Sequence, residues 1–371
     1  MMQKKLLLFS YDFPPSNGGI ARLCQEISSG MDTYYSEILI ITKKKSGPSL
    51  PYNKNNLKIV ELPSKRFFCE IASFIYLLKI KNKKSYDVLC GIWHPEGFLS
   101  LATGFKNIYI LGHGTEFLSG ASRFRKLFWL PVYAKLVLIN VKKVIANSNY
   151  TKGLVNEISK NIKCDTLTLA VNATFFRQQM ELRQNGDKIN ICSVSRIEKF
   201  KGHDFIAKTI ASLPIQYRNK IHWNIAGTGP FLIELKQMIV DLNLNELVTF
   251  QGFIPDIELP KFYNLNDVFI LCSREEPNST SVEGFGLVFL EAQSCGVPCI
   301  AVNSGGISDA VENKNGGWLI TQGDEMVLSS IFKEIIDDPN IIINQGELAR
   351  NRILKGYTWI LYNEKLKALM S

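Results

Sequence analysis

The sequence predicts two α/β domains in tandem, each built on a doubly wound parallel sheet. Three observations point to this fold: a length of 371 residues, a hydrophobic content of 46%, and short apolar runs that alternate with longer mixed segments. At ~100–200 residues per domain, the chain is long enough to form two cores. Short strands that alternate with helical segments are typical of parallel sheets covered by helices.

The first half of the chain contains seven predicted strands. They are short runs rich in β-branched residues or leucine, namely Leu6–Ser10, Ile38–Thr42, Leu57–Leu62, Val88–Ile92, Ile108–Leu111, Val144–Asn147 and Asp165–Leu169. Helical segments such as Ile20–Ser29 and Ile71–Ile80 separate most of them. This order predicts a first domain over residues 1–180.

The alternation of strands and helical segments is interrupted over Gln178–Lys188. This segment is polar, which predicts a linker between domains. A second series of predicted strands follows: Ile189–Ser195, Ile221–Ala226, Val248–Phe250, Val268–Cys272, Pro298–Val302 and Trp318–Ile320. It predicts a second domain over residues 185–356. We expect two Rossmann-like domains that face each other across a cleft, with functional residues just after strands, because ligands bind at the carboxyl ends of parallel strands.

Composition excludes several classes of protein. No apolar stretch reaches the ~18–20 residues of a membrane span, and no low-complexity tract suggests disorder. The N-terminus has too short an apolar run for a signal peptide and reads as the first strand of a cytoplasmic protein. The eight cysteines include no C-x-x-C pair, which favours free thiols in a reducing compartment.

Positive charge is concentrated in the first half. Residues 1–180 carry 25 Lys and Arg against 11 Asp and Glu, whereas the remainder has an acidic excess of 5. Basic residues alternate with aromatic ones after Phe117 and again from Lys65 to Lys84. This pattern suits a surface resting on an anionic bilayer, and the alternative is a solvated basic face with the aromatic residues in the core. No nucleic-acid-binding motif accompanies the charge.

Glycines and cations follow several predicted strands. Gly18 and Gly19 lie between the first strand and its helix, where backbone N–H groups can approach a phosphate. Arg196 and Lys201 follow the strand that ends at Ser195, and two such cations can hold a diphosphate and stabilise it as a leaving group. The alternative for the glycines is an ordinary turn between a strand and a helix, and the alternative for Arg196 and Lys201 is a solvated basic loop.

The strongest signal is the segment from Glu283 to Glu291. Gly284 and Gly286 are expected to open a helix whose free N–H groups, at Phe285 to Leu287, bind phosphate or a sugar oxygen. Along a helix axis, the two glutamates would be ~12 Å apart. One carboxylate could then bind sugar hydroxyls while the other binds the ribose of the same nucleotide sugar.

The histidines and the lack of a metal-binding motif give further information on the chemistry of the site. His113 lies between glycines directly after a predicted strand, where it could hydrogen-bond a sugar or stabilise charge. His94 also follows a strand, whereas His203 and His222 read as structural residues. No Asp-x-Asp motif occurs, so neither a metal site nor any other cofactor is expected.

These features together resemble the retaining glycosyltransferases of family 4, which have the two-domain GT-B fold. The resemblance spans nearly the whole chain. It rests on Pro14-Pro15 with Gly18-Gly19, His113-Gly114, Arg196 with Lys201-Gly202, Gly227-Thr228-Gly229-Pro230, Glu283-x7-Glu291, Ser304-Gly305-Gly306 and Tyr357-Thr358-Trp359. The last of these resembles the start of a terminal helix, residues 357–371, that returns to the first domain.

The resemblance implies a role for each matching residue. Gly19, Arg196 and Lys201 would bind the donor's diphosphate, and Glu283 would bind sugar hydroxyls. Phe285, Gly286 and Leu287 would offer backbone N–H groups, Glu291 would bind the ribose, and Ile254 would meet the base through its backbone. His113 would touch the transferred sugar, and the departing phosphate would take the acceptor's proton, so no general base is needed.

Loop similarities favour GDP-mannose as donor, with a UDP-hexose or UDP-N-acetylhexosamine as the alternative. The implied acceptor is a lipid-linked saccharide at the inner face of the cytoplasmic membrane, in surface polysaccharide (O-antigen or capsule) assembly. Two other classes are less favoured by the residues. A sugar-nucleotide 2-epimerase needs more acid–base groups around the sugar, and a non-catalytic scaffold would not need Arg196, Lys201 and both glutamates.

Overall fold

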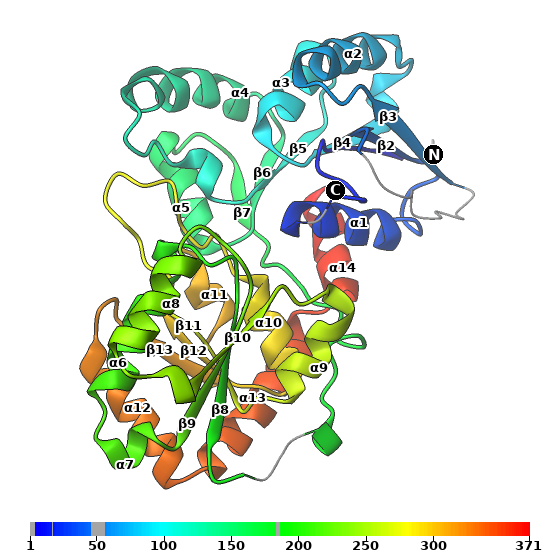
Figure 1. The fold of residues 1–371 in the computed structure, drawn as a ribbon. Helices are drawn as coiled ribbons and strands as arrows, with labels where there is room; N and C mark the ends of the chain where they lie inside the picture. The colour runs from blue at the N-terminus through cyan, green and yellow to red at the C-terminus, as the bar shows by residue number, and fades with distance from the viewer. Residues whose placement is uncertain (1–3, 17, 46–55, 183–185) are drawn as a thin grey trace. The chain divides into compact units, whose positions relative to one another are not determined.

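The computed structural model describes residues 4–16, 18–45, 56–182 and 186–371, which form two compact units (Figure 1). The first unit runs to Leu169 and includes the terminal segment Trp359–Ser371. The second unit is Ala170–Thr358.

The first unit contains a seven-stranded parallel sheet in the order β3-β2-β1-β4-β5-β6-β7. Its strands are β1 (Lys5–Phe9), β2 (Ile38–Lys43), β3 (Leu57–Leu62), β4 (Tyr86–Cys90), β5 (Ile108–Gly112), β6 (Lys143–Ala146) and β7 (Cys164–Thr166). Its helices are α1 (Gly19–Gly30), α2 (Arg66–Lys79), α3 (Phe98–Ala102), α4 (Lys135–Ile139), α5 (Asn149–Ile158) and α14 (Trp359–Leu369), with π-helical segments η2 (Trp93–Gly97) and η4 (Arg125–Ala134). Residues 46–55 lie outside the described ranges.

The second unit contains a six-stranded parallel sheet in the order β10-β9-β8-β11-β12-β13. Its strands are β8 (Ile189–Val194), β9 (Ile221–Ala226), β10 (Val248–Gly252), β11 (Val268–Leu271), β12 (Cys299–Val302) and β13 (Gly317–Ile320). Its helices are α6 (His203–Ser212), α7 (Ile215–Arg218), α8 (Leu232–Asp241), α9 (Leu259–Asn264), α10 (Leu287–Ser294), α11 (Ile307–Ala310), α12 (Glu325–Asp337) and α13 (Asn340–Gly356).

Each unit buries its own core. In the first, Phe9, Ile41 and Val88 are fully buried, and in the second Trp223 and Ile270 are. Strands covered on both faces become continuous apolar runs, which is why the β-branched segments of the sequence identify them. Every predicted strand overlaps an observed one, so the prediction of two doubly wound, Rossmann-like domains is confirmed.

The boundary between the units differs from the prediction. The chain enters the second unit after Leu169 rather than near residue 180, so the predicted linker begins too late. Arg350 explains this, since its guanidinium donates to the carbonyl oxygens of Ala173 and Phe176 at 3.0 and 3.1 Å. Asn264 likewise donates to the Arg177 carbonyl at 2.9 Å. Residues 183–185 of the predicted linker lie outside the described ranges.

The terminal helix α14 belongs to the first unit. Asn363 donates to the carbonyl oxygen of Glu26 in α1 at 3.4 Å, and the Tyr109 hydroxyl donates to that of Met370 at 2.7 Å. The helix begins at Trp359, two residues later than expected, because Tyr357 and Thr358 pair within the second unit. A hydrogen bond of 2.9 Å from Val171 N–H to the Tyr357 carbonyl secures this pairing.

Candidate functional site

In both units several of the predicted site residues follow the strands at which the sheet order reverses. In the second unit, β9 and β10 extend the sheet on one side of β8, and β11 to β13 extend it on the other. In the first unit, β1 and β4 stand at the corresponding place. The carboxyl ends of strands at such a point form a crevice that binds ligands in open α/β sheets. Arg196 and Lys201 follow β8, and Glu283 lies in the segment after β11.

Lys201 and Glu283 form a salt bridge in the second unit. The Lys201 Nζ atom lies 2.6 Å from Glu283 Oε2, and the two side chains are only 14% and 16% exposed. The ammonium also lies 4.9 Å from the centre of the Phe200 ring. In such partly buried surroundings a charge pair is screened less than at the surface. The bridge therefore holds both charged groups in place while leaving further ammonium protons for a ligand.

The backbone of Glu283 is held by the loop after β12. Gly306 N–H donates to the Glu283 carbonyl oxygen at 2.8 Å. Gly305 has a φ of +54°, and a Cβ atom there would lie 2.4 Å from the same carbonyl oxygen. Only glycine lets these loops approach so closely. The Ser304-Gly305-Gly306 segment thus positions the Glu283 carboxylate.

The predicted helix from Glu283 to Glu291 is shorter than expected. The helix α10 begins at Leu287, and Glu283 lies in the loop before it. Gly286, with a φ of +94°, is the residue that turns the chain into the helix. The expected separation of ~12 Å along one helix axis therefore does not apply. The free N–H groups of the first turn remain at the helix start, next to Gly284 and Phe285.

Glu291 lies within α10 and is buried. It is 4% exposed, and its Oε2 accepts a hydrogen bond of 3.0 Å from the Tyr263 hydroxyl. Burial and the adjacent carboxylate raise the pKa of Tyr263 well above its usual value, so this hydroxyl stays protonated and remains a donor. Glu291 is therefore oriented by α9, which carries Tyr263.

The remaining predicted residues of the second unit are more exposed. The Arg196 side chain is 73% exposed, and its Nη1 atom lies 3.1 Å from Glu198 Oε1. Ile254 lies two residues beyond β10 and is half-buried, next to the exposed Phe253. The structure brings Lys201 and Glu283 into contact and leaves Arg196 in solvent.

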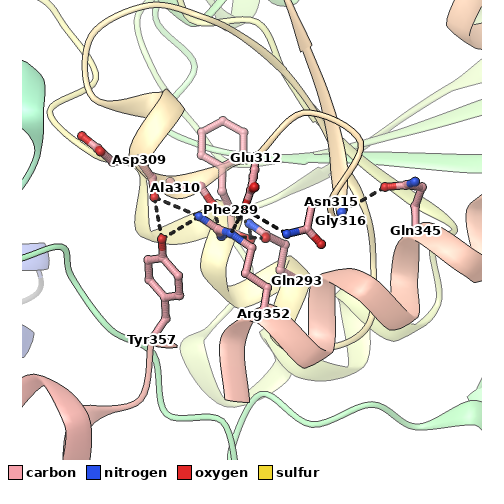
Figure 2. Close-up of polar contacts among 10 residues, drawn as sticks. All are labelled: Phe289, Gln293, Asp309, Ala310, Glu312, Asn315, Gly316, Gln345, Arg352 and Tyr357. Carbon is pink, nitrogen blue, oxygen red and sulfur yellow. Dashed lines mark hydrogen bonds and ion pairs between the residues drawn. The ribbon is translucent and has the colours of Figure 1, made fainter. Parts of the chain in front are cut away.

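A network around Arg352 joins α13 to the end of α10 (Figure 2). Its guanidinium donates to the Ala310 carbonyl at 2.8 Å, to Gln293 Oε1 at 3.1 Å and to the Asp309 carbonyl at 3.1 Å. It also stacks on the Tyr357 ring at 4.3 Å. A planar cation with several donors suits such a cluster of carbonyl groups. Arg352 therefore fixes α10 and α11, the two helices that adjoin the Glu283 and Gly305 loops.

Two of the predicted residues of the first unit lie at the start of α1, after β1. Gly18 precedes the helix and Gly19 is its first residue. The Arg22 N–H donates to the Gly18 carbonyl at 3.0 Å, while the N–H groups of the first turn have no partner within the helix.

His113 directly follows β5. Its Nε2 lies 2.7 Å from the Gly91 carbonyl oxygen, and its backbone N–H donates to Glu116 Oε1 at 2.6 Å. A carbonyl can only accept, so Nε2 is the donor in this contact, and Nδ1 is the ring atom left to accept. His113 can therefore accept a hydrogen bond from a hydroxyl group.

Sequence reasoning missed two polar groups near these sites. Arg274, after β11, binds both carboxylate oxygens of Asp204 at 2.9 and 3.0 Å. Glu96, after β4, is buried and accepts from the Tyr11 N–H at 3.1 Å, while its Oε2 has no hydrogen-bond partner among the described residues. The available signal was a charged residue in the segment that follows a strand, but only the fold shows which partner each of these residues contacts.

Two helical segments of the first unit expose large apolar side chains. In α2, Cys69, Ser73 and Leu77 are buried, yet Phe67 is 69% exposed. Along η4 and α4, Leu127 is 74% exposed. The remaining exposed apolar residues of these segments and the residue before η4 are Phe68, Ile71, Phe74, Ile75, Leu78, Phe124, Phe128, Val132, Leu136 and Ile139. Within the described residues, no helix has the length and apolarity to cross a bilayer.

A family profile matches most of the second unit. Residues 175–357 match the profile described as "Glycosyl transferases group 1". These residues are nearly the whole of the second unit, so the second unit matches the group 1 glycosyltransferases.

Relatives include two transferases of different donor type. The chain is 31% identical over 186 residues to the GDP-mannose-dependent alpha-(1-6)-phosphatidylinositol monomannoside mannosyltransferase of Mycolicibacterium smegmatis, covering 50% of this chain and 48% of that protein. The match thus spans about half the length of that relative. The UDP-Gal:alpha-D-GlcNAc-diphosphoundecaprenol alpha-1,3-galactosyltransferase of Escherichia coli is 25% identical over 349 residues, covering 88% and 87%.

Solved structures show the same fold along almost the whole chain. The sucrose-phosphate synthase of Thermosynechococcus elongatus superposes with a TM-score of 0.79 at 20% identity, covering 99% of this chain and 98% of that one. The glycosyltransferase WaaG, involved in lipopolysaccharide biosynthesis, superposes with a TM-score of 0.68 at 14% identity, covering 98% and 99%. Both domains of this chain therefore have the GT-B type of architecture.

Proposed function

We propose that the chain is a retaining hexosyltransferase that moves a hexosyl group from a nucleotide-diphosphate sugar to a lipid-linked saccharide. The observation that carries the proposal is the Lys201–Glu283 bridge, which lies within the residues that match group 1 glycosyltransferases. A fixed ammonium suits a diphosphate and a fixed carboxylate suits sugar hydroxyls. These are the two sides of the bond that breaks in such a donor.

The donor would be held mainly by the second unit. Lys201 and Arg196 would bind the diphosphate, with backbone N–H groups at Phe285, Gly286 and Leu287. Glu283 would accept from hydroxyls of the sugar. The Glu291 carboxylate would accept from the ribose, and Ile254 would contact the base through its backbone. In the first unit, Gly18 and Gly19 would offer N–H groups to the diphosphate.

The reaction would replace one bond to the anomeric carbon by another on the same face of the sugar. The bond from this carbon to the diphosphate breaks, and a bond to the acceptor's hydroxyl oxygen forms. The proton of that hydroxyl passes to the departing phosphate, whose charge Lys201 and Arg196 stabilise. His113 would accept a hydrogen bond from the transferred sugar through Nδ1. No side chain acts as general base and no metal takes part.

GDP-mannose is the proposed donor, and a UDP-hexose is the second candidate. The mannosyltransferase relatives of about 30% identity support the first, although they match only half of this chain. The galactosyltransferase relative supports the second, because it matches 88% of this chain.

The acceptor is proposed to be a saccharide on a diphospholipid at the inner face of the cytoplasmic membrane, in surface polysaccharide assembly. The exposed apolar faces of α2 and of η4 with α4 support this, since exposed basic residues flank them: Lys65, Arg66, Lys79, Lys126 and Lys135. Apolar groups can enter the interface while the cations bind anionic headgroups.

Calorimetric binding of GDP-mannose, UDP-glucose, UDP-GlcNAc and UDP-GalNAc tests the donor. We expect one of them to bind, with an affinity that falls at least ~10-fold in Lys201→Ala and Glu291→Ala. Lys199→Ala is the matched control, because Lys199 lies in the same turn with an exposed side chain. If no donor binds, or if the control loses as much affinity, the proposed site is wrong.

Product analysis separates this proposal from an epimerase or a scaffold. A glycoside with a retained anomeric configuration is expected, rather than a free epimer or no product. Turnover is expected to survive EDTA. A rate that EDTA abolishes and Mg²⁺ restores would contradict the metal-independent mechanism.

A further inference from the structure

A hollow of about 390 Å³ lies within the first unit, and none of the proposed donor residues lines it. Its volume falls in the range of small-molecule sites. It is lined by Arg66, Ile92, Trp93, His94, Glu116, Phe124, Arg125 and Trp129. These residues come from the start of α2, from η2 and from the segment around η4. The elements adjoin, since α3 contacts α2 and η2, and η2 contacts α4.

Two arginines supply positive charge to this hollow. Arg66 donates from Nε to Glu70 at 2.8 Å, and its side chain is 72% exposed. Arg125 donates from Nη2 to the Glu116 carbonyl oxygen at 2.9 Å. Its buried Nε has no hydrogen-bond partner among the described residues, so its guanidinium is short of acceptors. An anion with several oxygens would provide them.

Aromatic rings form the wall beside the arginines. The His94 ring lies 4.9 Å from Trp129, and His94 Nδ1 lies 2.9 Å from the Tyr133 hydroxyl. Burial lowers the pKa of His94 and raises that of Tyr133 to about 12, so both groups are neutral near pH 7. The aromatic faces, the neutral His94 and Tyr133 side chains and the Glu116 carboxylate suit a sugar ring. They do not suit a second phosphate, because they carry no positive charge.

The lining of the hollow also includes an exposed apolar ring and a carboxylate. Phe124 lines the hollow, is 60% exposed and packs against Phe128 at 5.6 Å. Glu116 also lines the hollow, and its Oε1 accepts from the backbone N–H of His113. A ligand seated here could place an apolar portion at Phe124, a phosphate at the arginines and a sugar beside Glu116 and the aromatic wall.

We propose that this hollow binds the phosphate and the adjoining sugar of a prenyl-diphosphate-linked saccharide, the acceptor of the reaction. Arg66 and Arg125 bind the phosphate, Trp129 stacks on the sugar, and Glu116 accepts from a sugar hydroxyl. The proposal rests on the proposed function and specifies which surface of the first unit recognises the acceptor.

Binding of a synthetic farnesyl-diphosphate-linked N-acetylglucosamine tests it, followed by tryptophan fluorescence and calorimetry. We expect Arg125→Gln and Arg66→Gln each to weaken binding about 10-fold, and Trp129→Leu to weaken binding and reduce the fluorescence change. Lys106→Gln removes an exposed charge of the same unit outside the hollow and should bind within about twofold of the wild type.

Three outcomes overturn the proposal: no binding by the wild-type chain, wild-type affinity in both arginine variants, or pyrophosphate alone binding as tightly as the whole probe. Donor affinity measured in the same variants separates this test from that of the proposed function. Arg125→Gln should bind the donor as the wild type does. If the wild-type chain binds the probe but no donor, the proposed function fails while the acceptor hollow stands.

Discussion

The backbone N–H of Gly306 donates to the Glu283 carbonyl oxygen at 2.8 Å, which ties the loop after β12 to the loop that carries the carboxylate. Together with the 2.6 Å bridge from Lys201, this contact fixes Glu283 from two directions. The candidate donor site therefore depends on loops that follow three different strands, β8, β11 and β12.

Gly305→Ala should displace Glu283. The new Cβ atom would lie 2.4 Å from the Glu283 carbonyl oxygen, in a backbone conformation that alanine rarely adopts. We expect donor affinity to fall at least ~10-fold in calorimetry. The control is Gly323→Ala, which has a φ of +80° but no heavy atom near its Cβ position. It should lose about 1 kcal/mol of stability and keep its donor affinity. Equal affinity in both variants would refute this role of Gly305.

Lys201 and Glu283 should act as a coupled pair. Lys201→Met leaves Glu283 without its cation, and Glu283→Gln removes the charge but keeps the shape of the side chain. We expect each to lower the transfer rate ~10²–10³-fold, and the double variant to lose much less than the product of the two losses. Initial rates with the donor identified by calorimetry measure this. Strictly multiplicative losses would show that the two groups work independently.

Arg352→Met should destabilise the second unit. The variant keeps much of the side-chain length but loses the guanidinium donors to the Asp309 and Ala310 carbonyl oxygens, which then retain only Tyr357 and Gln293 as donors (Figure 2). The expected loss is about 3 kcal/mol in urea unfolding, with Arg352→Lys intermediate because lysine cannot make the planar set of bonds. Arg218→Met is a suitable control, since Arg218 makes one contact of 3.4 Å to a carbonyl. An Arg352→Met variant as stable as this control would contradict the expectation.

Glu96 should make stability fall as pH rises. Burial raises the pKa of Glu96 from its ordinary value of 4.5 to about 8 in the folded chain. Between these values the folded state binds the proton and the unfolded state does not, so folding loses stability from pH 4.5 to about 8. Glu96→Gln stays neutral and keeps an acceptor for the Tyr11 N–H.

Thermal unfolding at pH 5, 6.5 and 8.5 measures this effect. The stability of Glu96→Gln relative to the wild type should grow with pH, whereas Glu61→Gln, a change at an exposed acid, should show no such trend. A constant difference across this range would mean that Glu96 is already ionised in the folded chain.

The exposed apolar helices should bind anionic vesicles. In flotation with phosphatidylglycerol-containing vesicles, we expect salt-sensitive binding that the double variant Phe67→Ser, Leu127→Ser reduces several-fold. Ile233→Ser removes a side chain that is 84% exposed on the second unit and should not reduce binding. Salt-insensitive binding, or equal loss in the control, would argue against a membrane surface at α2 and η4.

Local sequence patterns were sufficient to predict both sheets and the location of most candidate residues. Strands buried on both faces must be apolar along their length. Runs such as Ile38–Thr42 and Val268–Cys272 can therefore be predicted as strands from their own residues alone. Glycine and charged residues directly after such runs then mark the ends where ligands bind. The positions of Lys201 and His113 follow from this rule, whereas Glu283 was identified from the glycines beside it.

Tertiary structure decided what depends on partners distant in sequence. The helix that contains Glu291, α10, begins at Leu287 and not at Glu283. The reason is that Gly286 has a positive φ and that the Gly305 loop occupies the space beside Glu283. The polar segment around Arg177 joins the second unit because Arg350 and Asn264 bind its carbonyl groups. The exposure of Phe67 and Leu127 could also not be predicted from the sequence. A pattern of basic and aromatic residues fits equally a helix that packs its rings into the core and one that exposes them to solvent. The local pattern of apolar and polar residues indicates which side chains can be buried. Which partners they contact depends on the tertiary packing of the chain.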